Sequence, residues 1–240
     1  MKLGKLIIVL TILWVGLLAL QCMVITPTIT EITVLWDVTD TTIGKPKSDE
    51  ILPLYHLDGE DVWNGALFRI STLSNVNFNP TEELTLPPRN KWLSNELQRQ
   101  KEIGTFKSQI ALSIDAPQTE DIGRSSSSLY WPVFIELKRL AEQTGERRIM
   151  VIQSDLMENS ADLSLYDPKQ LKAFTTDPTS VKYLTENIAQ LPPLKGIEVY
   201  MIYRPMNTVD SERYTLISEV LTNLLQEKGA KVYRSANLIR

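Results

Sequence analysis

An aspartate followed by two threonines at alternate positions is the pattern in this 240-residue chain with the clearest chemistry. Asp37, Thr39 and Thr41 come directly after the run Ile32–Trp36, which is typical of a strand buried on both faces. One carboxylate and two hydroxyls on a short loop suit Mg²⁺, because this hard cation prefers oxygen ligands. The same residue types also form ordinary turns and helix caps, so the spacing alone leaves both interpretations open.

Two further segments are expected to bring oxygen side chains to the same edge of a sheet. Asp155 ends a second apolar run that begins at Arg148, and four serines at 125–128 precede the helix that leads into that strand. Ligand sites in open α/β sheets lie at the carboxyl ends of the strands. We therefore expect Asp155 and one serine, Ser126 or Ser127, to join the first loop. At least one of the four serines is also expected to cap the helix, which would explain one hydroxyl but not four.

The elements that position these residues alternate between strand and helix. Strands are expected near 32–37, 66–73, 76–86, 148–155, 196–203 and 231–235, and helices near 92–112, 129–140, 178–191 and 214–228, with a short helix near 48–56. This order predicts an α/β fold, a three-layer Rossmann-like sandwich with a mostly parallel six-stranded sheet. The second and third strands are close enough in sequence to form an antiparallel hairpin. Residues 28–240 are expected to form this one domain.

The N-terminal segment, 1–27, predicts attachment to a membrane. Leu6–Ile25 is almost unbroken apolar sequence, about the ~20 residues that a membrane-spanning helix needs. Lys2 and Lys5 precede it, which places the following domain on the extracytoplasmic side. The segment fits an uncleaved signal anchor. It also fits a lipoprotein signal, since Leu18–Cys22 resembles a lipobox, although Gln21 is an unusual residue directly before the cysteine.

Composition excludes several classes of site. The chain is 43% hydrophobic and 22% charged, as in globular proteins. A net charge of −4 and the lack of a basic cluster argue against a nucleic-acid partner. Cys22 and His56 are each the only residue of their type, so one chain cannot form a disulfide framework, a cysteine-based zinc site or a multi-histidine centre.

The combined pattern resembles a von Willebrand factor type A (VWA) domain with a metal-ion-dependent adhesion site. The family pattern is Asp-x-Ser/Thr-x-Ser, then a Thr or Ser from a second loop, then an Asp after the fourth strand. Asp37, Thr39 and Thr41 match its first element, Ser126 or Ser127 the second, and Asp155 the last. The chain departs from the family pattern at Thr41, where Ser is commoner, and in the weak helix signal after the first loop.

The resemblance implies a binding module and not an enzyme. It implies a bound Mg²⁺, or Mn²⁺ or Ca²⁺, with one coordination position left for an Asp or Glu carboxylate of a protein partner. No pair of a nucleophile and a base stands out in the sequence, so no turnover is expected. The predicted protein is a membrane-tethered, extracytoplasmic interaction module of the cell envelope.

Two other functions remain open from the sequence. Asp-x-Thr-x-Thr is similar to the Asp-x-Asp-x-Thr loop of haloacid-dehalogenase-like phosphatases, in which the first Asp is the nucleophile. Residue 39 is Thr and not Asp, however, and no Asp-Asp dipeptide occurs in the chain. The other alternative is a metal-free structural scaffold of an envelope complex.

Overall fold

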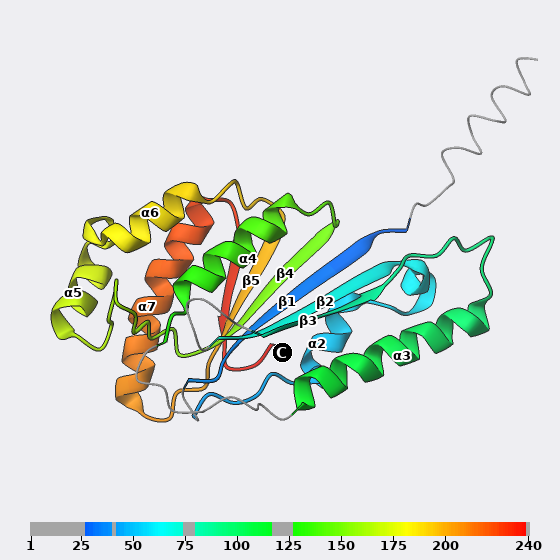
Figure 1. Cartoon of the computed structure of the whole chain (residues 1–240), viewed down its shortest axis with the longest axis horizontal. Coiled ribbons are helices and arrows are strands. Elements are labelled where there is room, and N and C mark those ends of the chain that lie inside the picture. The colour runs from blue at the N-terminus through cyan, green and yellow to red at the C-terminus, as the bar shows by residue number, and fades with distance from the viewer. Residues whose placement is uncertain (1–26, 40–41, 74–79, 117–126, 239–240) are drawn as a thin grey trace, which may run out of the picture.

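A six-stranded β-sheet runs through the centre of the molecule (Figure 1). The structure is a computed structural model and describes residues 27–39, 42–73, 80–116 and 127–238. The spatial order of the strands is β3-β2-β1-β4-β5-β6. β2 and β3 are antiparallel, and the other neighbouring strands are parallel. The strands are β1 (Ile29–Asp37), β2 (Gly65–Leu73), β3 (Thr81–Leu86), β4 (Arg147–Gln153), β5 (Ile197–Ile202) and β6 (Lys231–Ser235). The mostly parallel α/β sheet with one antiparallel pair is confirmed.

Helices cover both faces of this sheet. They are α2 (Ser48–Ile51), α3 (Glu96–Asp115), α4 (Tyr130–Glu142), α5 (Pro168–Thr176), α6 (Lys182–Gln190) and α7 (Thr208–Glu227), with 3₁₀ turns at Leu52–Tyr55, Gly59–Trp63 and Pro178–Ser180. α2 and α3 pack on the face that includes Val34, and α4 to α7 pack on the face that includes Leu35. Because side chains alternate along a strand, β1 contributes to both apolar cores, and the result is a three-layer arrangement.

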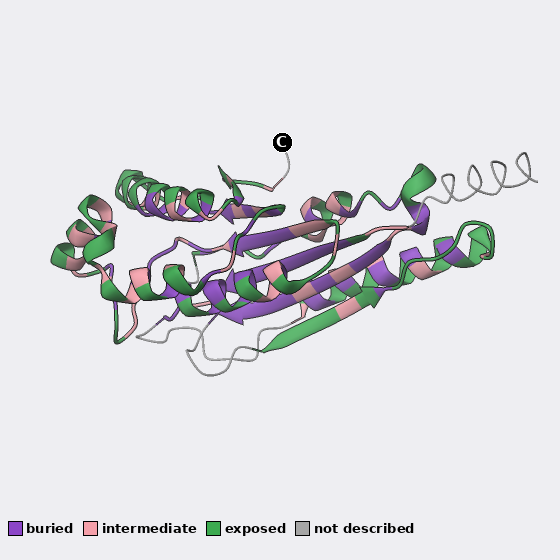
Figure 2. Ribbon diagram, turned by 90° about the horizontal axis from the view of Figure 1, so that it is seen from above, coloured by how far each residue is buried: buried purple, intermediate pink, exposed green. Residues whose placement is uncertain are grey.

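β1 is the most protected strand of the sheet. It lies between β2 and β4 (Figure 1). Eight of its nine residues are buried, and the strands at the centre of the sheet are largely purple in Figure 2. A strand covered on both faces needs the continuous apolar run that the sequence shows at 32–36. The edge strand β3 is largely exposed, apart from Leu86 at its end. The strand order reverses between β1 and β4, and α/β sheets of this order bind ligands beside such a reversal.

A buried charge network lies between β1 and α4. The Arg139 guanidinium forms an ion pair with Glu31, which is 2% exposed, and donates to Thr33 Oγ1 at 2.7 Å. Its Nε donates to Glu136 Oε2 at 2.7 Å. Although burial alone lowers the pKa of Arg139, the carboxylates of Glu136 and Glu31 raise it above its usual value, so the guanidinium stays charged. The network fixes α4, and therefore the residues at its N-terminus, against β1.

Several helix boundaries differ from the sequence prediction. α5 was not predicted, although Asp167 caps it and Pro168 occupies its first turn. The helix expected at 178–191 begins as a 3₁₀ turn and becomes α-helical only at Lys182. The helix expected from residue 214 already begins at Thr208, where the Asn207 side chain accepts a hydrogen bond from the Asp210 amide. Short capped segments are hard to separate from turns in a sequence.

The start of α3 also differs from the prediction, and Trp131 at the start of α4 is partly exposed. The helix expected from Trp92 begins at Glu96, and its inward face is made by residues such as Ile103, Phe106 and Ile110. Trp131 is 38% exposed, whereas its neighbours Tyr130 and Phe134 are buried. The expected hydrophobic helix at the N-terminus lies outside the described residues. Among the helices that are described, none combines the length and apolar character needed to cross a bilayer.

Candidate metal centre

Asp37 ends β1 and is held by hydroxyls from two segments. Its carboxylate is 1% exposed. Ser154, the residue after β4, donates from Oγ to Asp37 Oδ2 at 2.8 Å. Thr39 donates to Oδ1 from both its backbone amide at 3.0 Å and its hydroxyl at 2.6 Å. The parallel pairing of β1 with β4 thus brings the loop after each strand to the same carboxylate.

Asp155 stands on the second of these loops, in a tightly folded turn. Its Oδ1 accepts from the Met157 amide at 2.9 Å, and Ser154 Oγ accepts from the Leu156 amide at 2.9 Å. Leu156 has a φ of 65°, a left-handed conformation that is costly for a residue with a branched side chain. The turn fixes Ser154, which donates to Asp37. The next residue, Asp155, is partly buried.

Glu158 closes the same loop and was missed in the sequence. Its side chain is fully buried, and Oε2 accepts from the amides of Leu129 at 2.7 Å and Tyr130 at 2.9 Å. The carboxylate therefore caps the start of α4, where the helix dipole favours negative charge. This corrects the expectation of a serine cap, because the N-cap residue is Leu129 and makes no side-chain cap.

Two buried oxygen atoms in this region have no hydrogen-bond partner in the described part of the chain. They are Ser127 Oγ and Glu158 Oε1. Their segments lie side by side, since Ser127 and Asn159 exchange two backbone hydrogen bonds of 2.9 Å. Burial raises the pKa of the Glu158 carboxyl and the charge of Asp37 adds to this rise, while the nearby Ser160 hydroxyl and the two amides act in the opposite direction. A cation is the kind of group that satisfies such oxygens.

The structure brings most of the predicted site residues to one edge of the sheet. Asp37 ends β1 and Thr39 follows it, Asp155 follows β4, and Ser127 lies three residues before α4. The other two predicted ligands, Thr41 and Ser126, lie outside the described residues. Within the described ranges, no three His, Cys, Asp or Glu residues are arranged to hold a metal ion, so a cation here would depend on hydroxyl ligands. Glu158 had no distinguishing sequence signal, because only the folded loop buries it.

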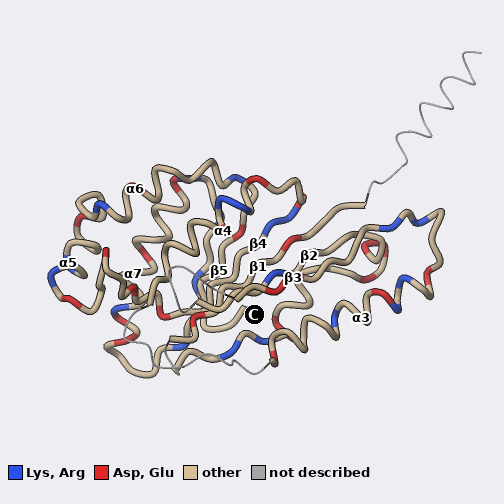
Figure 3. Tube along the Cα trace, viewed as in Figure 1, with Lys and Arg blue, Asp and Glu red and all other residues tan. Residues whose placement is uncertain are grey.

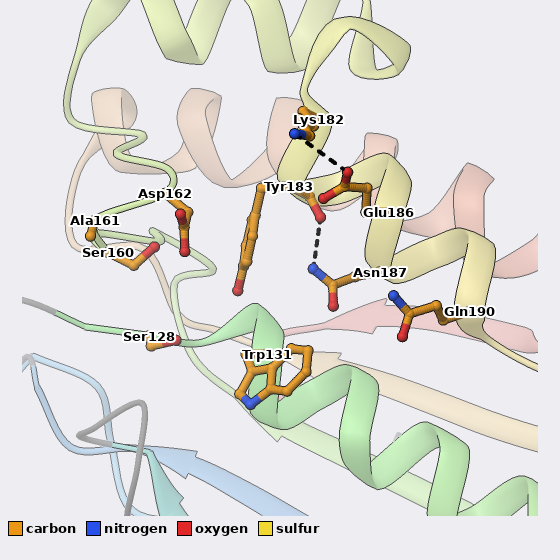
Figure 4. Close-up of a pocket in the computed structure, with 10 residues that line it drawn as sticks. All are labelled: Ser128, Trp131, Ser160, Ala161, Asp162, Lys182, Tyr183, Glu186, Asn187 and Gln190. Carbon is orange, nitrogen blue, oxygen red and sulfur yellow. Dashed lines mark hydrogen bonds and ion pairs between the residues drawn. The ribbon is translucent and has the colours of Figure 1, made fainter.

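Cavities open near this edge of the sheet. One, of about 720 Å³, lies between the start of α4, the 160–162 loop and α6. Figure 4 shows Trp131 and Tyr183 across it from each other, with Ser128 at one end. A second cavity, of about 300 Å³, includes Asp155 and Arg213 in its lining. The candidate centre is therefore flanked by space that a partner's side chains can enter.

Comparison with known proteins gives no family assignment. No protein-family model matches the chain, and no curated protein matches it.

Proposed function

We propose that this chain is a membrane-tethered, extracytoplasmic binding module, similar to VWA domains, that binds a divalent cation and a carboxylate of a protein partner. The proposed ligands are Asp37, Thr39, Thr41, Ser126 or Ser127, and Asp155. The cation is Mg²⁺, or Mn²⁺ or Ca²⁺. The observation that carries the proposal is two buried oxygens, Ser127 Oγ and Glu158 Oε1, that have no hydrogen-bond partner among the described residues. The charge of the buried Asp37 also acts on the Glu158 carboxyl.

The charge of the donors supports a site that recruits an anion. Asp37 and Asp155 offer two carboxylates, and the remaining proposed ligands are neutral hydroxyls. When bound, Mg²⁺ supplies a directional coordination position that an incoming carboxylate can fill. Thr39 and Ser154 orient the Asp37 carboxylate through three hydrogen bonds. Glu158 accepts hydrogen bonds from the amides of Leu129 and Tyr130, and this contact fixes the start of α4 next to the serine segment.

The topology supports the same position for the site. The reversal of strand order lies between β1 and β4. Asp37 ends β1, Thr39 follows it and Asp155 follows β4, whereas the proposed serine lies in the segment before α4. Folds with this strand order bind ligands in the crevice there. The flanking cavities leave room for the partner's main chain and neighbouring side chains.

Mg²⁺ is expected to stabilise the full-length protein against thermal unfolding. A ligand that binds only the folded state at 100 times its Kd adds about 2.7 kcal/mol of stability. The measurement is the Tm of the chain in detergent with Mg²⁺, Mn²⁺ or Ca²⁺, compared with the chelator-treated protein. Ser127→Ala is expected to reduce this increase in Tm, because it removes a buried hydroxyl oxygen that is proposed to bind the cation. An unchanged Tm with all three cations would contradict a metal site and favour the metal-free scaffold.

A further inference from the structure

Three large apolar side chains project into solvent where the chain turns from β3 into α3. Trp92, Leu93 and Leu97, together called here the Trp92 surface, are 83%, 87% and 82% exposed. Asn90 shapes the turn, since its side chain accepts from the Trp92 amide at 2.9 Å and its carbonyl accepts from the Leu93 amide at 3.1 Å. Clustered exposed apolar residues of this size mark an interaction surface, unlike single ones.

The base of the Trp92 surface is fixed to the sheet. Arg99, in the second turn of α3, is 1% exposed. Its guanidinium donates to three backbone carbonyls, those of Val62 at 2.8 Å, Pro87 at 2.9 Å and Asn64 at 2.5 Å. Three such bonds hold the 3₁₀ turn before β2, the end of β3 and the start of α3 together. The apolar side chains therefore project from a rigid platform.

The described chain begins beside this platform. The Thr28 amide donates to Asn64 Oδ1 at 3.0 Å, and the Thr28 carbonyl accepts from the Gly65 amide at 2.7 Å. Gly65 is packed so closely that an added Cβ would lie 2.8 Å from the Pro88 ring. In Figure 1, the start of β1 and the turn before α3 lie at the same end of the molecule, and Figure 2 agrees. The apolar run Leu6–Ile25 ends only three residues ahead of Thr28.

We propose that the Trp92 surface inserts into the interfacial layer of the same bilayer that holds the N-terminal segment. This inference rests on the membrane tether in the proposed function. Tryptophan favours the boundary between headgroups and acyl chains, because its ring is apolar and its indole N–H needs a polar partner. The two leucines extend the apolar contact toward the acyl chains. With so short a connection to residue 25, the tether keeps this end of the molecule at the membrane.

The charges around the Trp92 surface indicate that the contact is apolar. Arg89 pairs with Glu102 at 2.9 Å, and Lys91 pairs with Glu60 at 2.6 Å. Acidic and basic residues are also interspersed along α3 (Figure 3). Because this charge is balanced locally, anionic headgroups gain little here, and docking is expected on a zwitterionic bilayer.

Docking of this surface would orient the candidate metal centre. β1 runs from the membrane-proximal end of the molecule to Asp37, and nine residues at about 3.3 Å each span roughly 30 Å. The carboxyl edge of the sheet would then face away from the bilayer, where a partner can reach it. Two attachments, the tether and the Trp92 surface, restrict the tilt of the domain more than a single flexible tether does.

The test is quenching of Trp92 fluorescence by lipids that carry bromine on their acyl chains. The full-length chain is reconstituted into zwitterionic liposomes with and without the brominated lipid. Subtracting the spectrum of Trp92→Phe from that of the wild type isolates the emission of Trp92. Trp131→Phe gives the matched control, since Trp131 is also partly exposed but lies at the start of α4. Both substitutions keep an apolar ring at an exposed site, so both variants are expected to fold.

Roughly half or more of the Trp92 emission is expected to be lost in brominated liposomes, because interfacial side chains reach 5–10 Å into the headgroup and acyl boundary. The Trp131 emission is expected to stay unchanged. Unquenched Trp92 in protein that floats with the liposomes would overturn docking and leave the tether intact. Protein that does not float with them would overturn the tether, and docking with it, whatever cation the site binds.

Discussion

Asp37→Ala is expected to weaken divalent-cation binding by more than about 100-fold, because it removes one of two carboxylates that neutralise the cation. Asp37 is also the point where the loops after β1 and β4 meet, through its hydrogen bonds to Thr39 and Ser154. Asp37→Asn is the companion variant, since it keeps the size of the side chain and removes only its charge. The measurement is calorimetric titration of Mn²⁺ into the full-length chain in detergent.

The chain offers a matched control at Asp177. In Asp177-Pro178-Thr179 the threonine hydroxyl donates to the aspartate, as Thr39 does to Asp37. This second Asp-x-Thr turn lies on the surface, beyond α5, and no strand in the described part of the chain contributes a hydroxyl to it. Asp177→Ala is expected to leave Mn²⁺ binding unchanged. Equal loss in both variants would mean that the titration reports general binding to acidic surface groups.

The same Asp37 variants separate the alternative functions. A phosphatase would hydrolyse a phosphate ester in the presence of Mg²⁺, and Asp37→Ala would abolish that turnover because it removes the nucleophile. A metal-free scaffold would show no saturable cation binding in the wild type, and the substitution would change only its stability. The binding module that we propose binds the cation, has no turnover and loses the cation in the variant.

Arg139→Ala is expected to lower the free energy of unfolding by about 3–5 kcal/mol, because it leaves the buried Glu31 without its cation, whereas Glu136 keeps its ion pair with Arg69. Glu31 would be left buried under α4 without its cation, and Thr33 Oγ1 would lose its donor. The measurement is urea unfolding of the full-length chain in detergent, followed by tryptophan fluorescence.

The control for this loss is an exposed ion pair. Lys182 and Glu186 lie 3.7 Å apart on α6, with side chains that are 84% and 61% exposed. Lys182→Ala is expected to change stability by no more than about 0.5 kcal/mol, because solvent screens such pairs. If Arg139→Ala lowers the free energy of unfolding by less than about 1 kcal/mol, this would contradict the interpretation that solvent is largely excluded from the β1–α4 network.

The sequence predicts the sheet better than it predicts the site. β1 and β4 were predictable because their continuous apolar runs have few alternatives to a buried strand, and the hairpin partners follow each other closely. α5 was missed because nine residues with one fully buried side chain, Phe174, resemble a loop. Tertiary packing alone decides that Glu158 is buried and Trp92 exposed, since neither differs locally from ordinary charged or amphipathic sequence.

Within the site, the sequence indicated which segments meet but not how their side chains pair. Asp37 was recognisable from its position after a buried strand. The hydroxyl that bonds its Oδ2 is Ser154, a residue that the spacing argument passed over in favour of Asp155. That pairing depends on the register between β1 and β4 and on the left-handed turn at Leu156, neither of which leaves a pattern in the sequence.

The most direct test of the central claim is the broadening of backbone amide signals by Mn²⁺ in nuclear magnetic resonance spectra of the full-length chain. Paramagnetic broadening falls steeply with distance, so it locates the cation without any substitution. A single site predicts selective loss of signals from Thr39, Ser127 and the 154–158 turn at low Mn²⁺, while those around Asp177 persist. Broadening centred on exposed acidic residues such as Asp58 and Glu60, with the Asp37 region unaffected, would contradict the account.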